Sequence, residues 1–515
     1  MNEISPQAGA PAVRDEATLG SGRPGNCLAS LWDLIDRLNS AGIAYCYWKS
    51  SRRVAAVLAG ESDLDLLVGR PDQHRIQDVL SACGFKLFPN AAATSDTATL
   101  SYIGFDEPSG RLTHVHLHMR LTLGAKLLPN YRPPWERGLL ARAMLHPFYP
   151  IRVLSPADEA VLLAVRACLE LRRVDPVVMR HWGEAVSKFA TDHDELARRL
   201  NPADLRARAA ELMGDGCADL VADAFCQGTP LNEQRQLRRH IRRDMAAYRV
   251  YGRLEAGLRG AFRFGRAVVG VLNRQLVHAP RPWRRCAPGG GLVVALLGVD
   301  GSGKSTALHA TQTWLSQEVD TMPVYFGTGD GRPSLALLPL KLLVPLFNRL
   351  HPSRPKGSSH GAVTDRPPDL IYTIALALWA SVLAWEKRSK LRRARRGADR
   401  GLVVIADRYP QDQILTFNDG PLLPRLTWIP RWLRRFEERS YALARQLPPD
   451  LLFKLRADPD LLARREPTMK RAVIEQRVRE LDRLSFPGTT VVCLNASEPA
   501  AEVARAIRRE IWRLI

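Results

Sequence analysis

Residues 289–306, GGGLVVALLGVDGSGKST, constrain the fold of this chain more than any other stretch. The apolar run Leu292–Leu297 has the length and the branched side chains of a buried parallel strand. It leads directly into Gly298–Ser305, which fills every fixed position of the pattern G-x-x-x-x-G-K-[ST]. The stretch therefore predicts a strand, a phosphate-binding loop and a helix in direct succession. A plain turn between strand and helix is the alternative.

The residue types of this loop suit the phosphate groups of a nucleotide. Glycines let successive backbone N–H groups turn towards phosphate oxygens, and the helix N-terminus adds a positive dipole. Lys304 can reach the β- and γ-phosphates, and the Ser305 hydroxyl can ligate Mg²⁺. We therefore expect ATP with Mg²⁺ as the ligand. The nucleotide-binding residues expected are Gly298, Asp300, Gly301, Ser302, Gly303, Lys304, Ser305 and Thr306.

The charge balance of the chain favours anionic partners. Its 515 residues carry 74 lysines and arginines against 53 aspartates and glutamates, a net charge of +21. Such an excess suits nucleotides, nucleic acid or an anionic membrane surface, although a general use of surface arginine would also produce it. The eight cysteines form no C-x-x-C pair, and the first residues lack the pattern of a secretory signal peptide. These features predict two or three domains in the reducing cytoplasm.

Two carboxylates in the first part of the chain share one face of an expected strand. Residues 1–26 are rich in Gly, Pro and Ala and are expected to be disordered. An α+β domain with a helical subdomain is expected over residues 27–231. Asp63 and Asp65 alternate with apolar residues, so both project from the same side of the strand and can hold Mg²⁺.

The spacing of these carboxylates resembles the nucleotidyltransferase superfamily of the polymerase β type. Trp48–Ser50 stands where that family has a small-residue motif, with a lysine in place of a glycine, and Asp63-x-Asp65 follows at a suitable distance. The family's third carboxylate would fall on the strand Leu112–Arg120, which offers histidines instead. Active nucleotidyl transfer, a transition-metal site and a degenerate binding or structural module are all compatible with this pattern. The histidines are His114, His116 and His118.

Residues 232–288 are expected to form a basic helical linker. Arginines recur there at helical spacing, with apolar residues between them. Such a helix can be a solvated connector or can lie on an anionic membrane surface through residues 232–285. Contact with nucleic acid is the least favoured reading, and the sequence predicts no oligomeric state. The arginines concerned are Arg235, Arg238, Arg239, Arg242, Arg243, Arg249, Arg253, Arg259, Arg263 and Arg266.

Residues 289–515 alternate strands with helices, which predicts a doubly wound parallel sheet. Gly401–Asp407 is another buried strand, and Asp407 and Arg408 stand at its carboxyl end. Ligands of α/β sheets bind at these ends, so Asp407 is placed to meet Mg²⁺ and Arg408 to meet phosphate. The apolar stretch Leu370–Trp385 is shorter than the roughly 20 residues of a membrane span. We expect it to form a helix buried against the sheet.

The two motifs together make this part of the chain resemble thymidylate kinase. Gly298–Thr306 matches that family's Gly-x-Asp-Gly-x-Gly-Lys-Ser/Thr-Thr loop, and Asp407-Arg408-Tyr409 matches its Asp-Arg-Tyr motif. The resemblance implies that Asp300 meets the sugar hydroxyl of the acceptor. It also implies that a cation on the helix before Asp407 clamps the acceptor phosphate. The implied acceptor-binding residues are Asp300, Lys387, Arg388, Arg408 and Tyr409.

The same resemblance implies a flexible lid with basic residues, expected over Pro459–Arg483. An arginine there would stabilise charge on the phosphoryl group during transfer, although a solvated helix face explains the same charges. Lys470 and Arg471 also lie in this segment. The implied metal ligands are Ser305 and Asp407. The implied catalytic residues are Lys304, Asp407, Arg408, Arg464 and Arg465.

Three departures from thymidylate kinase concern the acceptor rather than ATP. Leu297 replaces a glutamate, no Arg-Glu-Pro-Gly-Gly segment follows the second strand, and Pro410–Pro421 replaces a short segment near the base. The sequence predicts transfer of the γ-phosphoryl group of MgATP to a nucleoside monophosphate, dTMP above all. The alternatives are a kinase of a sugar or lipid-linked intermediate in surface polysaccharide synthesis, or a nucleotide-gated regulatory module. Binding of the linker to lipid would place the protein at the inner face of the membrane.

Overall fold

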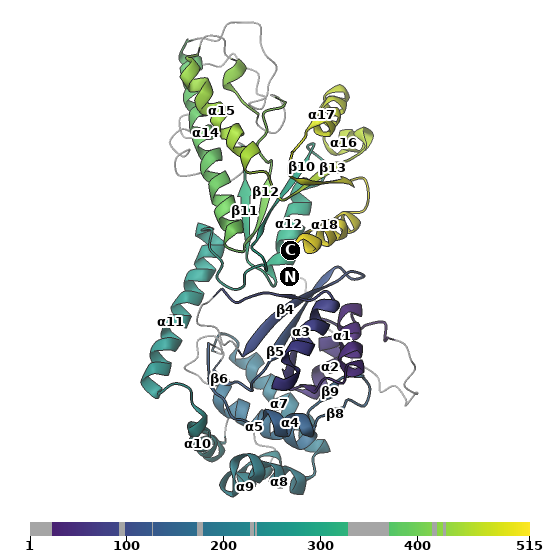
Figure 1. Cartoon of the computed structure of the whole chain (residues 1–515), viewed down its shortest axis with the longest axis vertical. Helices are drawn as coiled ribbons and strands as arrows, with labels where there is room; N and C mark the ends of the chain where they lie inside the picture. The colour runs from purple at the N-terminus through teal and green to yellow at the C-terminus, as the bar shows by residue number, and fades with distance from the viewer. Residues whose placement is uncertain are drawn as a thin grey trace, which may run out of the picture.

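The structure, a computed structural model, describes residues 23–91, 98–125, 127–171, 179–226, 231, 234–327, 370–414, 420–425 and 429–515. It contains two large sheets, one mixed and one all parallel, in two bodies that lie end to end (Figure 1). Two expectations fall partly outside the described residues. They concern residues 1–22 of the predicted disordered segment and residues 415–419 of the segment that departs from thymidylate kinase.

The N-terminal sheet consists of seven short strands. These are β1 (Tyr45–Tyr47), β2 (Leu64–Val68), β3 (Lys86–Leu87), β4 (Thr99–Asp106), β5 (Arg111–His118), β8 (Met144–Leu145) and β9 (Arg152–Val153). They lie in the order β3-β4-β5-β2-β1-β9-β8. The central strand β2 pairs antiparallel with β1 and parallel with β5, so the sheet is mixed. A separate two-stranded ribbon is formed by β6 (Leu123–Ala125) and β7 (Leu128–Tyr131).

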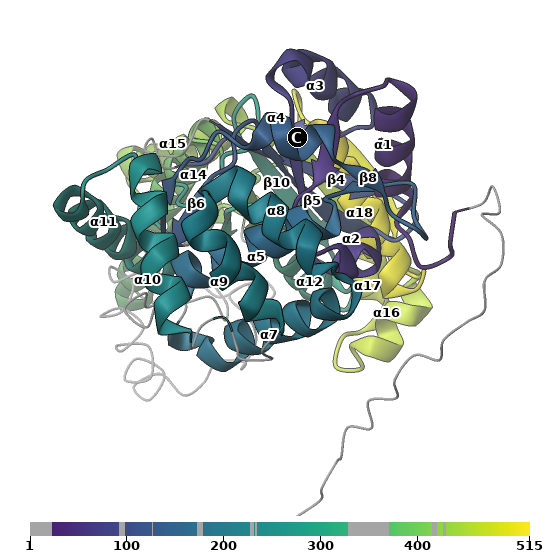
Figure 2. The same cartoon turned by 90° about the horizontal axis from the view of Figure 1, so that it is seen from below.

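Helices cover both faces of this sheet. They are α1 (Ala29–Ser40), α2 (Val54–Leu58), α3 (Gln73–Ala82), α4 (Glu136–Ala141), α5 (Pro156–Glu170), α7 (Trp182–Arg199), α8 (Pro202–Met213), α9 (Asp215–Cys226) and α10 (Arg235–Asp244). Apolar residues of α1, α2 and α3 pack against one face. The buried helix α5 packs against the other face, and α7 to α10 gather around it, as Figure 2 shows from below.

Alternation along β2 and β5 decides which side chains face which helices. Leu64 and Leu66 of β2, with Val115 and Leu117 of β5, belong to the core under α1 and α3. Residues of the opposite parity point away from that core because successive strand side chains alternate. Asp65 lies beside His116 in the parallel β2–β5 register. The strand periodicity therefore gathers the acidic and imidazole side chains on one face.

The basic segment leaves the helical bundle as one long helix. Leu237 and Ile241 of α10 are buried in the bundle core. After the short turn η3 (Met245–Tyr248), α11 (Arg253–Leu272) runs along the side of the N-terminal body and ends in η4 (Asn273–Val277) (Figure 1). Most of α11 is exposed. Its residues place apolar side chains in solvent.

The C-terminal sheet has five strands, all parallel, as expected from the alternation of strands and helices. They are β10 (Leu292–Gly298), β11 (Thr321–Tyr325), β12 (Val403–Asp407), β13 (Leu451–Arg456) and β14 (Thr490–Asn495). Their order is β11-β12-β10-β13-β14. The helices and the short turn η5 are α12 (Lys304–Ser316), α14 (Leu370–Asp399), η5 (Leu423–Arg425), α15 (Arg431–Gln446), α16 (Pro459–Arg465), α17 (Arg471–Arg483) and α18 (Ala500–Leu514).

The strand order explains how these helices are distributed. The chain moves outward from β10 to β11 and then returns to β12, which lies between them. Because both crossovers between parallel strands are right-handed, α12 and α14 fall on opposite faces of the sheet. Figure 1 shows α14 with α15 on one side and α12 with α18 on the other. The doubly wound arrangement follows.

The apolar stretch before residue 386 forms a helix as expected, but its burial differs from the expectation. Leu391 and Ala394 of α14 pack into the core of the sheet. The earlier half of the helix extends past the sheet, where Leu383 packs with residues from the region before α15. Leu378 and Trp385 are exposed there. Among the described residues, no helix combines the length and apolar character needed to cross a bilayer.

The two bodies share an apolar junction. Phe88 and Ile103 of the N-terminal half belong to the same core as Trp512 of α18. The rings of Phe88 and Trp512 are stacked with centroids 6.1 Å apart, and the Lys86 ammonium donates to the Trp512 carbonyl at 2.6 Å. The ring of Phe105 meets Trp314 of α12 edge-on at 5.7 Å. Aromatic packing therefore holds the helix that follows the phosphate-binding loop against the first sheet.

Candidate functional site

The loop between β10 and α12 has the backbone geometry that its glycines predict. Gly301 and Gly303 adopt φ of 81° and 80°, a region that favours glycine. A Cβ on Gly298 would lie 2.4 Å from the Ser302 hydroxyl, so this position has no space for a side chain. Lys304 is buried and donates to the Gly298 carbonyl at 3.0 Å. The Lys304 ammonium thus connects the end of the loop to its beginning on the inner side.

Several loop groups remain available to a ligand. The Ser302 hydroxyl is buried and, among the described residues, has no hydrogen-bond partner. Ser305 and Thr306 are exposed at the start of α12. Burial lowers the pKa of the Lys304 ammonium, although Asp407 and Asp300 oppose this effect. A buried cation at a helix N-terminus is suited to a polyphosphate.

Asp407 occupies the carboxyl end of β12, beside Leu296 of β10 in the parallel register. Burial raises the pKa of its carboxyl, and the nearby Lys304 ammonium opposes that rise. Within the described part of the chain, its Oδ1 is buried and accepts no hydrogen bond. A buried carboxylate oxygen without a donor is costly unless a ligand or cation meets it. The Asp407 carboxylate and the exposed Ser305 hydroxyl at the start of α12 are oxygen ligands of the hard kind that Mg²⁺ prefers.

Two arginines meet Asp300 above the loop. The Arg408 guanidinium lies 3.5 Å from Asp300 Oδ1, and Arg477 donates to Asp300 Oδ2 at 2.9 Å. Arg408 follows β12 directly and has φ of 57°, the left-handed region that non-glycine residues seldom adopt. Backbone strain of this kind clusters at functional sites. The loop carboxylate therefore connects the end of the sheet to α17.

The basic segment expected to form a lid does lie over the loop. Arg464 and Arg465 at the end of α16 are both exposed, and Arg465 donates to the Gly301 carbonyl at 3.1 Å. Arg477 was not among the residues that the sequence pointed to. The helical periodicity of this segment could have identified Arg477. Ile474 and Leu481 of α17 are buried, and residue 477 lies on the same helix face.

Three other residues that were expected to bind the acceptor, Lys387, Arg388 and Tyr409, make contacts away from Asp300. Lys387 is buried, and its ammonium donates to the Tyr441 hydroxyl at 2.7 Å. The Arg388 guanidinium lies 5.9 Å from the ring centroid of Phe436. The hydroxyl of Tyr409 donates to the Leu447 carbonyl. Lys387 and Tyr409 therefore use their polar groups within the protein in this structure.

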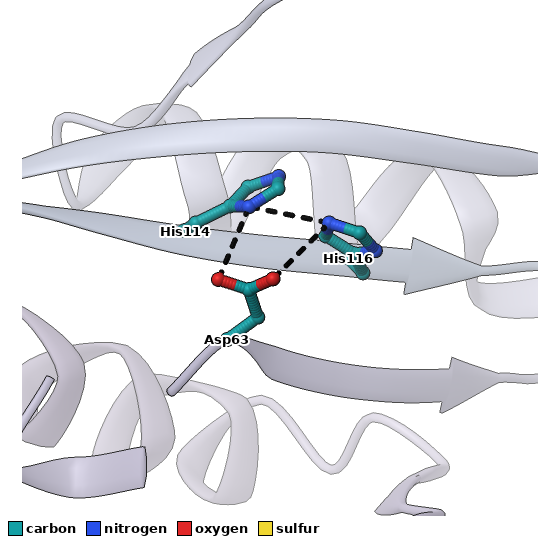
Figure 3. A group of neighbouring side chains, drawn as sticks. All are labelled: Asp63, His114 and His116. Atoms are coloured by element: carbon teal, nitrogen blue, oxygen red, sulfur yellow. Dashed lines mark hydrogen bonds and ion pairs between the residues drawn. The ribbon is translucent and has the colours of Figure 1, made fainter. Parts of the chain in front are cut away.

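A second group of polar side chains lies on the N-terminal sheet (Figure 3). His114 Nδ1 is 3.3 Å from Asp63 Oδ1 and 3.2 Å from His116 Nε2. His116 Nε2 is 3.7 Å from Asp63 Oδ2. Burial and the neighbouring His114 lower the pKa of His116 to about 3, so this imidazole is neutral at physiological pH. The two rings and the carboxylate converge on one point.

Asp65 is paired differently from Asp63. His118 Nε2 lies 3.2 Å from Asp65 Oδ1, and His116 Nδ1 lies 3.8 Å from the same oxygen. Burial opposes ionisation of Asp65. The Lys49 ammonium and His118 outweigh it and hold the pKa of this carboxyl well below its usual range. The lysine that replaces the family glycine thus supplies a positive charge beside one of the two predicted metal ligands.

Fold and site together define an α/β protein with a glycine-rich loop between a parallel strand and a helix, a pattern typical of phosphate binding. Comparison with known proteins finds 28% identity over 223 residues to the uncharacterized ATP-binding protein YghS of Escherichia coli K12, covering 42% of this chain and 92% of YghS. The uncharacterized ATP-binding protein YghR of the same strain is 28% identical over 254 residues, covering 47% of this chain and 94% of YghR. No protein-family model matches the chain. More than half of this chain lies outside each match.

Proposed function

We propose that this protein transfers the γ-phosphoryl group of MgATP to an acceptor phosphate, as its resemblance to thymidylate kinase implies. The observation that carries the proposal is the convergence of Lys304, Asp407 and Arg408 at the carboxyl end of a parallel sheet, with Arg477 added from α17. The names of its Escherichia coli relatives support ATP as the donor. The acceptor favoured by the resemblance is a nucleoside monophosphate, dTMP above all.

In the proposed reaction an ionised oxygen of the acceptor phosphate attacks the γ-phosphorus in line. The bond between that phosphorus and the β,γ-bridging oxygen breaks, and ADP leaves with the electron pair. An ionised acceptor needs no side chain to remove a proton. Lys304 neutralises charge on the β- and γ-phosphates, and Arg408 stabilises charge on the group in transfer. Mg²⁺, held by Ser305 and Asp407, would offset the negative charge of the triphosphate.

Asp300 has a second role in this proposal. In the ligand-free arrangement it binds both Arg408 and Arg477. A ligand that hydrogen-bonds to Asp300 would release these guanidinium groups towards phosphate oxygens, which they bind more strongly in a bidentate manner. Asp300 therefore keeps two cations near the loop before substrate arrives.

The direct test is formation of ADP by the full-length protein with ATP, Mg²⁺ and a panel of monophosphates. We expect turnover with at least one of them and its loss in Lys304→Ala. Saturable ATP binding without turnover of any nucleoside, sugar or lipid-linked acceptor would remove the kinase proposal. It would favour the nucleotide-gated regulatory module, for which Lys304→Ala should abolish ATP binding and leave any partner unresponsive to ATP.

We also propose that α11 attaches the protein to an anionic membrane surface at the inner face of the membrane. Leu254, Leu258 and Phe262 follow at helical spacing and are 87%, 75% and 61% exposed. An exposed apolar stripe of this kind suits the headgroup boundary of a bilayer. Arginines of α10, with Arg249 and Arg253, line a cavity of about 1160 Å³ beside α11, which adds positive charge along this helix. This attachment favours the lipid-linked intermediate as the alternative acceptor.

Vesicle sedimentation tests this attachment. We expect binding to phosphatidylglycerol-containing vesicles, weaker binding in high salt because charge is screened, and loss in Leu258→Glu. The matched control is Val473→Glu, because Val473 is exposed on α17, away from α11. Leu433 is not used for this control, because its side chain packs against a hydrophobic core. Equal sedimentation of Leu258→Glu and the parent protein would contradict the proposal, and self-association through α11 would appear as a concentration-dependent mass instead.

A further inference from the structure

The two imidazoles and the carboxylate on the N-terminal sheet have a geometry of their own. His114 Nδ1 lies 3.3 Å from Asp63 Oδ1 and 3.2 Å from His116 Nε2, whereas His116 Nε2 lies 3.7 Å from the other carboxylate oxygen, Asp63 Oδ2. Two ligand atoms bound to one Zn²⁺ at about 2.1 Å and at tetrahedral angles lie about 3.4 Å apart. Two of these separations thus match the edge of a tetrahedral metal site, and one ligand atom from each of the three side chains lies within 4.8 Å of the other two.

The hydrogen-bonding capacity of the group also calls for a cation. His114 Nδ1 lies near two carboxylate oxygens, Asp63 Oδ1 at 3.3 Å and Glu318 Oε2 at 3.4 Å. Carboxylates only accept, and one ring nitrogen can donate one proton at most. Arg285 Nη2 lies 3.4 Å from the same nitrogen and therefore donates to it when Nδ1 is unprotonated. Around His114 Nδ1 there are therefore more lone pairs than hydrogen-bond donors, and a bound cation would accept the unused lone pairs.

We propose that one carboxylate oxygen of Asp63, with His114 Nδ1 and His116 Nε2, forms a site for a divalent transition-metal ion of the zinc type. Two imidazole nitrogens with one carboxylate oxygen suit Zn²⁺, whereas Mg²⁺ prefers oxygen ligands alone. The site differs from the Mg²⁺ pair Asp63 and Asp65 that the nucleotidyltransferase resemblance implies. It also lies apart from the phosphate-binding loop, and so is independent of the kinase proposal.

The neighbouring group of Asp65, His116 and His118 is the less suited of the two. Lys49 already supplies positive charge to Asp65, as the lowered pKa of that carboxyl reflects, and a second cation there would be repelled. At Asp63 the nearby cation is Arg285, whose guanidinium is already paired with Glu318 at 2.6 Å. His118 then orients Asp65 and leaves His116 Nε2 to the first group. One metal ion per chain is the expected stoichiometry.

The exposure of the ligands predicts the kind of metal site. The side chain of Asp63 is 49% exposed, whereas that of His114 is 2% exposed. Metal can therefore enter from the Asp63 side, and three protein ligands leave the fourth tetrahedral position to water. Sites with an open position bind a substrate oxygen or activate water, while structural zinc sites have four protein ligands.

Glu318 connects this site to the second body of the molecule. It follows α12, the helix that begins at Lys304, and its carboxylate accepts from Arg285 Nη1 at 2.6 Å. A metal on His114 Nδ1 displaces Arg285 Nη2 from that nitrogen. Arg285 remains bound to Glu318. The junction between the bodies therefore stays neutralised when the metal binds.

The test uses the full-length chain without an affinity tag, treated with a chelator and then dialysed. Zinc chloride is added in a calorimeter, and bound metal is counted by mass spectrometry after gel filtration. We expect about one equivalent, with affinity reduced at least about 100-fold in Asp63→Asn and His116→Asn, because loss of a direct ligand exceeds loss of a surrounding contact. Asp63 is half exposed, so Asp63→Asn should fold, which circular dichroism checks.

Two controls separate this site from others. His74→Ala removes an exposed histidine of α3 and should leave zinc affinity unchanged. His118→Ala should reduce affinity little, whereas a loss confined to His118→Ala and Asp65→Asn would overturn the assignment by placing the metal in the neighbouring group. All eight cysteines are free, and Cys226 and Cys493 are exposed. Substitution of Co²⁺ for Zn²⁺ shows whether these thiols bind the metal. A thiolate-to-cobalt charge-transfer band would overturn the proposal. Tetrahedral d–d bands without that charge-transfer band would support it. Failure to bind zinc at all would overturn it as well.

Discussion

Arg477 Nη1 donates to Asp300 Oδ2 at 2.9 Å and so connects α17 to the phosphate-binding loop across 177 residues of sequence. Asp300 also lies 3.5 Å from the Arg408 guanidinium. One loop carboxylate thus holds an arginine from the sheet and another from the lid segment. Their joint position above Lys304 leads to the first prediction.

Arg477→Ala should lower kcat for phosphoryl transfer by at least about 10-fold, because it removes positive charge from the position of the transferred group. Affinity for ATP should change less, since Lys304 and the loop amides remain. Steady-state kinetics and ATP titration measure the two effects. The matched control is Arg479→Ala, an exposed residue of the same helix. Equal losses in both variants would indicate that α17 acts only by its overall charge.

Asp407→Asn should shift the dependence of activity on Mg²⁺ to higher Mg²⁺ concentration and reduce turnover about 100-fold, because its carboxylate is a metal ligand in the proposal. The unliganded variant should be no less stable than the parent. Burial disfavours the charged form of Asp407, as its raised pKa indicates, and asparagine carries no charge. Thermal melts and magnesium titrations check both halves of the prediction. Asp399→Asn, at the exposed end of α14, is the control.

Glu159 provides a prediction of pH dependence. Its buried carboxyl accepts from the Ser51 backbone at 2.9 Å, and burial raises its pKa from 4.5 to about 7. A raised pKa means that the folded state binds a proton more tightly than the unfolded chain. Protonated Glu159 therefore makes its full contribution to the stability of the folded state below pH 4.5, and this contribution is lost as the pH rises through about 7.

Glu159→Gln should therefore remove this part of the pH dependence. At about pH 8 the variant should be more stable than the parent by on the order of 3 kcal/mol, the equivalent of the shift in pKa. Melting temperature of the N-terminal body, followed from acid to mildly alkaline pH, is the measurement. Glu184→Gln, an exposed position of α7, should follow the parent curve. A Glu159→Gln curve parallel to the parent would show that Glu159 does not titrate in this range.

Trp512→Ala should destabilise the junction between the two bodies. The indole is 8% exposed and stacks on Phe88 at 6.1 Å. Removing a buried tryptophan costs about 3–5 kcal/mol. Calorimetry should resolve two transitions in place of one, because the shared core no longer couples the bodies. Trp432→Ala removes a tryptophan that is 68% exposed and should leave the melting profile unchanged.

Local spacing in the sequence predicted the central parts of both candidate sites. The strand, loop and helix around Lys304 and the placement of Asp407 at a strand end need only short-range patterns, and the structure has both. Asp63 and Asp65 share a sheet face because strand side chains alternate. The alternation in Leu112–Arg120 likewise places three histidines on one strand face, but which histidine meets which carboxylate did not follow from it.

Only the tertiary structure decided the contacts made between distant segments. Arg477 reaches Asp300 because α17 packs over the loop, and Glu318 meets His114 because aromatic rings join the two bodies. Lys387, which the resemblance places near an acceptor phosphate, is buried and donates to the Tyr441 hydroxyl, a contact that its sequence position does not reveal. The physical reason is that periodicity fixes the face from which a side chain projects. The partner on that face depends on long-range packing, which no local pattern in the chain encodes.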